Sequence, residues 1–219
     1  RLVGSEMCIR DRCFDGLYSY GSRSFSIYDA EGNVVFDSGA DFENITKDMP
    51  GLNFNADNED PDFDDRSDNK GPEPEALTIG KVGDRTYAFI GAERVGGIFV
   101  YDVTPPAEAK FVTYVNNRDF SVGYDEDDVA ATTKAGDLGP EGLAFVPAAD
   151  SPAEDALLIA GNEVSGTTTV FSVKDLLADA SDNADSPAAS GSSDGSSNGS
   201  SVAAGVGIVA GLVGLGALI

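Results

Sequence analysis

Four glutamates recur at matched positions along the sequence and are its clearest candidates for chemistry. Glu141 follows Glu75 by 66 residues, and Glu163 follows Glu93 by 70 residues. Clustered carboxylates bind hard cations such as Ca²⁺, which prefer oxygen ligands. We therefore predict Glu75, Glu141, Glu93 and Glu163 as metal ligands. The alternative is structural, because a Pro-Glu step can simply set a bend where a strand begins.

These glutamates lie in short β-type segments that occur twice. The first copy comprises residues 75–79, 87–93 and 97–103, and the second comprises residues 141–145, 157–163 and 168–173. Gly-rich turns separate the segments, which is typical of β-propeller blades. The sequence thus predicts an all-β fold, a partial β-propeller of about two to three four-stranded blades. It would contain the end of one blade (residues 25–38), one complete blade (75–117) and three strands of another (141–173).

The segments between the strands are also informative. Residues 29–33 resemble a hairpin turn, and residues 40–50 suit a short helical or irregular connection. Residues 51–74 and 118–140 are long loops rich in Asp and Asn that precede equivalent strands. Loops of this length in compact domains are usually functional or disordered. Because propellers close with about four to eight blades, we expect this chain to be the C-terminal fragment of a longer protein.

The two ends of the chain differ from the blades. Residues 1–12 resemble a translated sequencing adapter and are left out of the fold prediction, which places the propeller blades at 13–177. Residues 178–201 are mostly Ser, Gly, Asp, Asn and Ala, which predicts a disordered stalk. Residues 202–219 carry no charged or polar side chain and predict a hydrophobic helix close to the thickness of a bilayer.

This ending matches a signal for a glycosylphosphatidylinositol (GPI) anchor, with Ser190 as the predicted attachment residue and Gly191 or Asp194 as alternatives. A retained transmembrane helix is the second interpretation, although no Lys or Arg follows it, and a truncated or soluble end is the third. Either anchor would place the propeller on the extracellular face of the plasma membrane. For an exported chain, Asn44 in Asn44-Ile-Thr46 is a predicted N-glycosylation site.

Composition excludes some classes of function. The formal net charge is −24, which argues against a nucleic-acid partner because phosphate binding requires clustered Lys and Arg. The sequence contains no histidine, so it offers neither a His-ligated zinc site nor an imidazole base. The expected partners are the membrane, through the anchor, and an extracellular or matrix ligand that the sequence does not identify.

Three motifs in order carry a resemblance to a known family. They are Phe63-Asp-Asp-Arg-Ser-Asp-Asn-Lys-Gly-Pro-Glu-Pro-Glu75, Gly139-Pro-Glu-Gly-Leu-Ala144 and Gly161-Asn-Glu-Val-Ser-Gly-Thr167. Over roughly residues 14–175 the chain resembles the choice-of-anchor I family, which includes mesenchyme-specific cell surface glycoprotein-like sequences. The resemblance implies an extracellular β-propeller that is tethered by variable C-terminal anchors and has no assigned reaction.

Two functions are compatible with these features. The first is a non-enzymatic binding or adhesion module on the cell surface, with Ca²⁺ as its candidate cofactor and no catalytic residue. The alternative is a secreted, calcium-dependent hydrolase similar to phosphatases and phytases. In that case Glu75, Glu141 and Glu163 would hold calcium, which activates water and neutralises phosphate charge. The absence of a catalytic constellation favours the first function.

Overall fold

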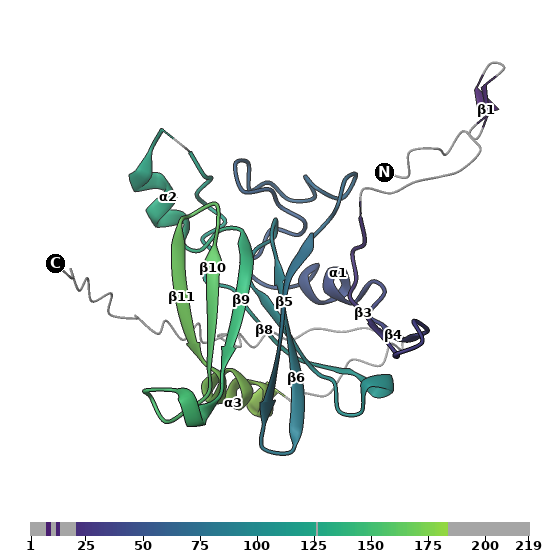
Figure 1. Cartoon of the computed structure of the whole chain (residues 1–219). Helices are drawn as coiled ribbons and strands as arrows, with labels where there is room; N and C mark the ends of the chain where they lie inside the picture. The colour runs from purple at the N-terminus through teal and green to yellow at the C-terminus, as the bar shows by residue number, and fades with distance from the viewer. Residues whose placement is uncertain (1–7, 10–11, 14–20, 126, 184–219) are drawn as a thin grey trace, which may run out of the picture.

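The computed structural model describes residues 8, 9, 12, 13, 21–125 and 127–183 and shows antiparallel sheets standing side by side (Figure 1). The strands are β1 (Cys8–Ile9), β2 (Arg12–Cys13), β3 (Ser26–Tyr28), β4 (Val34–Asp37), β5 (Pro74–Val82), β6 (Arg85–Ala92), β7 (Ile98–Asp102), β8 (Lys110–Val115), β9 (Pro140–Val146), β10 (Leu157–Asn162) and β11 (Thr167–Ser172). The α-helices are α1 (Asp41–Thr46), α2 (Val129–Ala135) and α3 (Val173–Asn183), and two short 3₁₀ turns are η1 (Pro106–Glu108) and η2 (Ala148–Asp150).

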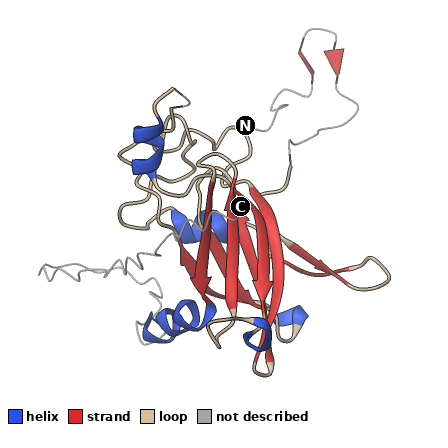
Figure 2. Cartoon of the chain, turned by 60° about the vertical axis from the view of Figure 1, so that its left-hand side comes forward, coloured by secondary structure: helices blue, strands red, loops and turns tan. Residues whose placement is uncertain are grey.

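The sheets confirm the predicted all-β fold of partial propeller blades. Besides the short β1–β2 ladder, the described sheets are a β3–β4 hairpin, a four-stranded sheet in the order β5-β6-β7-β8 and a three-stranded sheet in the order β9-β10-β11. They correspond to the predicted end of one blade, a complete blade and three strands of another. Strands dominate the described part of the molecule, and the helices lie at its ends and side (Figure 2).

The repeat extends to strand register. Leu77 pairs with Ile90 in the complete blade, and Leu143 pairs with Ala160 at the equivalent position of the next. β5 also lies against β9, where the ring of Phe145 fills the space beside Gly80. A Cβ at residue 80 would lie 2.3 Å from this ring, so glycine is required for the close approach of the two sheets.

Two apolar cores hold the sheets together, one on each face of the complete blade. Because side chains alternate along a strand, Ile90 and Phe99 face the first core while Phe89 and Val100 face the second. The first core joins the blade to α1, where the Phe42 ring stacks on Phe99 with centroids 4.2 Å apart. The second core joins the blade to the β9–β11 sheet and to α3.

The two long acidic loops meet at the end of the molecule opposite α3 (Figure 1). The Tyr124 N–H donates to the Asn58 carbonyl at 2.8 Å, and Arg118 donates to the Asp57 carbonyl. The first loop contains no helix or strand before β5 begins at Pro74, yet Asn55 and Asn58 are buried in it. The predicted short connection at 40–50 contains α1. The sequence analysis did not predict α2, which the Asp128 side chain caps within the second loop.

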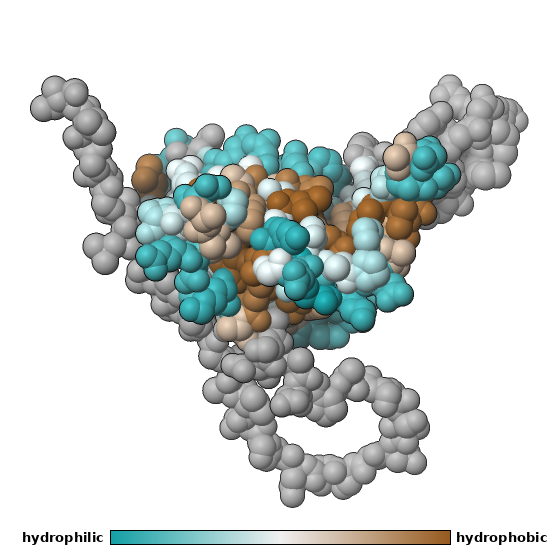
Figure 3. Space-filling model, turned by 60° about the horizontal axis from the view of Figure 1, so that its bottom comes forward, coloured by the Kyte–Doolittle hydropathy of each residue, from teal (hydrophilic) through white to brown (hydrophobic). Residues whose placement is uncertain are grey.

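The predicted stalk begins too early. α3 continues to Asn183, so residues 178–183 are helical instead of disordered. Val173 and Leu176 are buried on this helix, and the alanines that follow favour its continuation. The surface at this end shows apolar side chains between hydrophilic ones (Figure 3). None of the described helices is long and apolar enough to cross a membrane. The remaining stalk, Ser190 and residues 202–219 lie outside the described residues.

Candidate functional site: a row of carboxylates at the inner strands

Two β-bulges position the first pair of predicted ligands. Where β5 begins, Pro74 pairs with Ala92 and Ala76 pairs with Gly91, which leaves Glu75 as the extra residue. In β9 the equivalent shift leaves Glu141 between its paired neighbours. A bulge breaks the regular alternation of side chains and is common beside functional sites. Both glutamates are exposed, at the same end of neighbouring inner strands.

The second pair of predicted ligands follows the second strand of each sheet. The Glu93 N–H donates to the carbonyl of Glu73 at 2.8 Å, and the Glu163 N–H donates to the carbonyl of Gly139 at 2.7 Å. The same backbone bond therefore places both glutamates beside the strand start that carries Glu75 or Glu141. Glu93 is buried, with 7% of its surface exposed, whereas Glu163 is exposed.

The structure brings the four predicted residues together in what we call the carboxylate row, Glu93–Glu75–Glu141–Glu163. The side chains of Glu75 and Glu93 hydrogen-bond each other, as do those of Glu141 and Glu163. Burial, the bond to Glu75 and neighbouring carboxylates raise the pKa of Glu93 to about 8, although Arg94 opposes the shift. The pKa of Glu141 is raised chiefly by the charge of Glu163, then by their hydrogen bond, with a smaller effect from Glu75.

A fifth carboxylate, Glu73, joins the row at Glu93 and was missed by the sequence analysis. Lys70 and Arg94 donate hydrogen bonds to it, the latter at 3.1 Å, and Arg66 lies within 3.6 Å. Burial raises the pKa of Glu73, but the two donors outweigh it, so the pKa lies below its ordinary value. Glu73 has a φ of 55°, a left-handed conformation that is uncommon for a residue with a side chain.

The two blades differ at this point in a way that matters for charge. By the register of the repeat, Glu73 corresponds to Gly139, whose φ is 69°, and Arg94 corresponds to Val164. The Glu75–Glu93 pair thus has an internal cation. Among the described residues no Lys or Arg forms an ion pair with Glu75, Glu141 or Glu163. The repeat gave no signal for Glu73, because its counterpart in the second copy is glycine.

Geometry and charge favour different parts of the row for a cation. One oxygen each from Glu73, Glu75 and Glu93 lies within 4.8 Å of the others, which is close enough for a shared ion. However, Lys70, Arg66 and Arg94 already neutralise Glu73. An added cation would be repelled there, whereas no described basic side chain neutralises the exposed Glu141 and Glu163. Geometry therefore favours the group of Glu73, Glu75 and Glu93, whereas charge favours the Glu141–Glu163 end of the row.

Comparison with known proteins finds one family model and one relative that are similar to parts of this chain. Residues 4–106 match the family model of the choice-of-anchor I domain. This match covers slightly less than half of the chain. Gigasin-3a from Magallana gigas is 29% identical to it over 175 residues, which cover 77% of this chain and 61% of Gigasin-3a. The chain therefore spans less than two thirds of this relative, and no solved structure matches it.

The choice-of-anchor I match includes one half of the carboxylate row. It contains Glu73, Glu75 and Glu93 and ends before Glu141 and Glu163, while its start overlaps the residues that the sequence analysis set aside. The alignment with Gigasin-3a is longer than the family match. The domain and this relative indicate an extracellular or cell-surface module.

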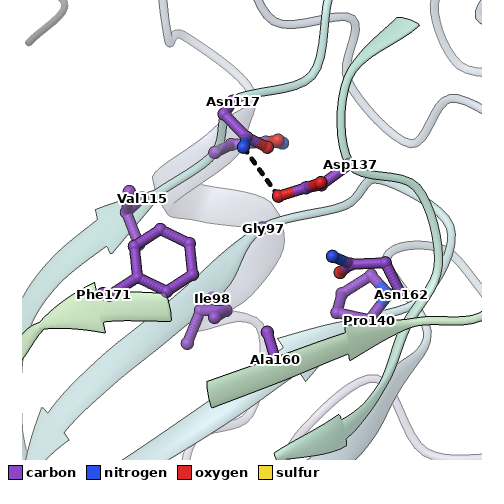
Figure 4. A pocket seen from close by; sticks show the side chains of 10 residues that line it. Gly97, Ile98, Val115, Asn117, Asp137, Pro140, Ala160, Asn162 and Phe171 are labelled. Atoms are coloured by element: carbon purple, nitrogen blue, oxygen red, sulfur yellow. Dashed lines mark hydrogen bonds between the residues drawn. The ribbon is translucent and has the colours of Figure 1, made fainter. Parts of the chain in front are cut away.

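Between the β5–β8 sheet and the β9–β11 sheet lies a small pocket (Figure 4). Asn117 points toward Asp137 and donates to it at 2.7 Å, while Thr167 and Thr169 donate to the same carboxylate. Ile98 contributes to the apolar side of the pocket. Since the donors come from both sheets, Asp137 links neighbouring blades close to the carboxylate row.

The predicted glycosylation residue, Asn44, lies exposed on α1. The hydroxyl of Thr46, the third residue of its motif, is buried and donates to the Phe42 carbonyl at 2.8 Å. Glycosylation at Asn44 stays a prediction.

Proposed function

We propose that this chain is part of a non-enzymatic binding or adhesion module, a β-propeller tethered on the cell surface, and that Ca²⁺ bound at Glu75, Glu141 and Glu163 supports its binding surface. The observation that carries the proposal is the carboxylate row. It lies where two neighbouring inner strands begin, which in a propeller is one opening of the central channel.

Charge supports a cation at the Glu141 end of the row. The three carboxylates provide up to six oxygens, and Ca²⁺ accepts six to eight oxygen ligands, including waters, in flexible geometry. These carboxylates are exposed, so a cation can reach them without opening the fold. Bringing like charges together in the folded state costs free energy, and a bound divalent cation offsets that cost.

Titration calorimetry of the complete extracellular domain with Ca²⁺ tests the metal site. We expect heat of binding and a higher melting temperature with Ca²⁺, and loss of both effects in Glu141→Gln and Glu163→Gln. Glu108→Gln is the matched control, because Glu108 is an exposed residue of η1 outside the row. Absence of heat and of any melting shift in the unsubstituted protein would refute the calcium site.

A hydrolysis assay separates the binding module from the hydrolase. A chelator-sensitive turnover of a generic phosphomonoester by the complete domain would favour the calcium-dependent hydrolase. Calcium binding without turnover supports the binding module, for which the row is a structural and recognition element.

The proposed tether is a GPI anchor attached at Ser190, with cleavage of residues 202–219. Release of the protein from intact cells by a phospholipase specific for phosphatidylinositol would support it. Retention of the protein after that treatment, together with peptides from residues 202–219 in the mature protein, would identify a transmembrane anchor instead.

A further inference from the structure

The β9–β11 sheet has three described strands where the preceding blade has four. β9, β10 and β11 correspond to β5, β6 and β7, and no described strand corresponds to β8. After β7, residues 103–109 lead into β8, whereas β11 is followed directly by α3, which packs against β8 and β11. Residues 173–183, the described residues that follow β11, therefore do not form the fourth strand.

The backbone groups on the free edge of β11 can be identified. The Val173 N–H donates to the Ala156 carbonyl at 2.9 Å, and hydrogen-bonded pairs alternate along an antiparallel ladder. The N–H and C=O groups of Thr168 and Val170 and the N–H of Ser172 consequently point away from β10, and no strand among the described residues pairs with this edge. The Ser172 carbonyl accepts the first hydrogen bond of α3.

The equivalent positions in the complete blade are all paired. Ile98 lies opposite Val115, Val100 opposite Thr113, and Asp102 opposite Lys110. The free edge of β11 is therefore equivalent to the edge of β7 that pairs with β8 in the complete blade.

The sequence of β11 also lacks residues that protect exposed edges. Natural edge strands carry charges, prolines or bulges, which prevent pairing with other strands. β8, the outer edge of the complete blade, begins with Lys110 and contains a register shift. β11 reads Thr-Thr-Thr-Val-Phe-Ser, carries neither a charge nor a proline, and pairs with β10 without a shift. Val170 on this strand is 55% exposed.

We propose that β11 pairs with a fourth, antiparallel strand contributed by the part of the longer protein that this chain does not include. The chain spans 61% of the length of Gigasin-3a, so a related protein has further sequence that could supply it. This strand would complete the blade as β8 completes its neighbour, and would join distant parts of the polypeptide across the ring. The inference rests on the propeller fold and is independent of the calcium site.

Hydrogen exchange of the complete protein, followed by mass spectrometry, tests the proposal. We expect the amides of Thr168, Val170 and Ser172 to exchange at least ~100-fold more slowly than unprotected amides, as ladder amides do. In the 219-residue chain alone the same amides should exchange without this protection. Exchange at the unprotected rate in the complete protein would overturn the proposal. Equal protection in the 219-residue chain would show that residues of this chain cover the edge. Protection that depends on protein concentration would indicate pairing with a second copy. Either result would also overturn the proposal.

A pair of substitutions at Val170 gives an independent measurement in the complete protein. Val170→Pro removes the outward N–H, which an unpaired edge tolerates but a paired strand does not. Val170→Thr keeps the N–H and the β-branched shape and serves as the control. We expect the proline variant, and not the threonine variant, to speed amide exchange in one peptide outside residues 1–219. Identical exchange in the two variants would contradict the fourth strand.

Discussion

Replacing Glu93 by glutamine should make the stability of the protein less dependent on pH. Burial and the contact with Glu75 raise the pKa of Glu93 from 4.5 to about 8 in the folded state. The folded protein then holds this proton more tightly than the unfolded chain does. The stability that Glu93 contributes is therefore fully present below pH 4.5 and is lost as the pH rises through 8.

The size of the effect follows from the proton linkage. One such group lowers the free energy of unfolding by up to ~1.4 kcal/mol per pH unit between the two pKa values. From pH 5 to pH 8 the total is at most ~4 kcal/mol. Glu93→Gln keeps the shape of the side chain and a hydrogen-bond donor toward Glu75, but it does not titrate. We expect the variant to match the parent near pH 5 and to be ~3 kcal/mol more stable at pH 8.

Thermal and urea unfolding from pH 5 to 8.5 measure this difference, with circular dichroism and the fluorescence of the seven tyrosines as probes. At pH 8 a gain of ~3 kcal/mol corresponds to a melting temperature roughly 6–12 °C higher for a domain of this size. Glu108→Gln removes one exposed carboxylate and should leave the pH profile unchanged. Parallel profiles for the parent and Glu93→Gln would refute the assignment of a buried, protonated Glu93.

Three further substitutions test the cores and the row. Phe42→Ala removes a fully buried ring stacked on Phe99 and should cost about 3–5 kcal/mol of unfolding free energy; a loss below ~1 kcal/mol in urea titrations would contradict the first core. Asp128→Ala removes the cap of α2 and should cost ~1 kcal/mol, while Asp128→Asn should restore most of it. Val164→Arg supplies the second blade with the counterpart of Arg94, so calorimetry should show ~10-fold weaker Ca²⁺ binding, and unchanged affinity would argue against a cation at Glu141.

The strands could be predicted from the sequence because the repeat supplied information that single segments lack. Short apolar runs are ambiguous between helix and strand, but the spacing of 66 and 70 residues linked each run to a counterpart. The same alignment matched Glu75 with Glu141 and Glu93 with Glu163. Glu75 and Glu141 interact because β5 and β9 are neighbouring inner strands.

The loops could not be predicted in the same way, because their structure depends on contacts far apart in the sequence. The first acidic loop looked solvated, yet Asn58 is buried where Arg118 of the second loop holds the Asp57 carbonyl. Glu73 was overlooked because its counterpart is Gly139, and a left-handed backbone position predicts glycine, not a charged residue. The helix over 178–183 depends on the burial of preceding residues such as Leu176, and composition does not report this.

The carboxylate row shows how one repeated backbone can support two electrostatic states. In the complete blade, β5–β8, Glu73 has a backbone conformation that glycine would adopt more easily. Its contacts with Arg94 and Lys70 offset the cost of that conformation. In the second blade glycine and Val164 take the two positions, so no described basic side chain compensates Glu141 and Glu163. The backbone bonds that position the glutamates are the same in both blades. The difference therefore lies in where the compensating charge comes from, and in our calcium proposal a cation from solution supplies it to the β9–β11 blade.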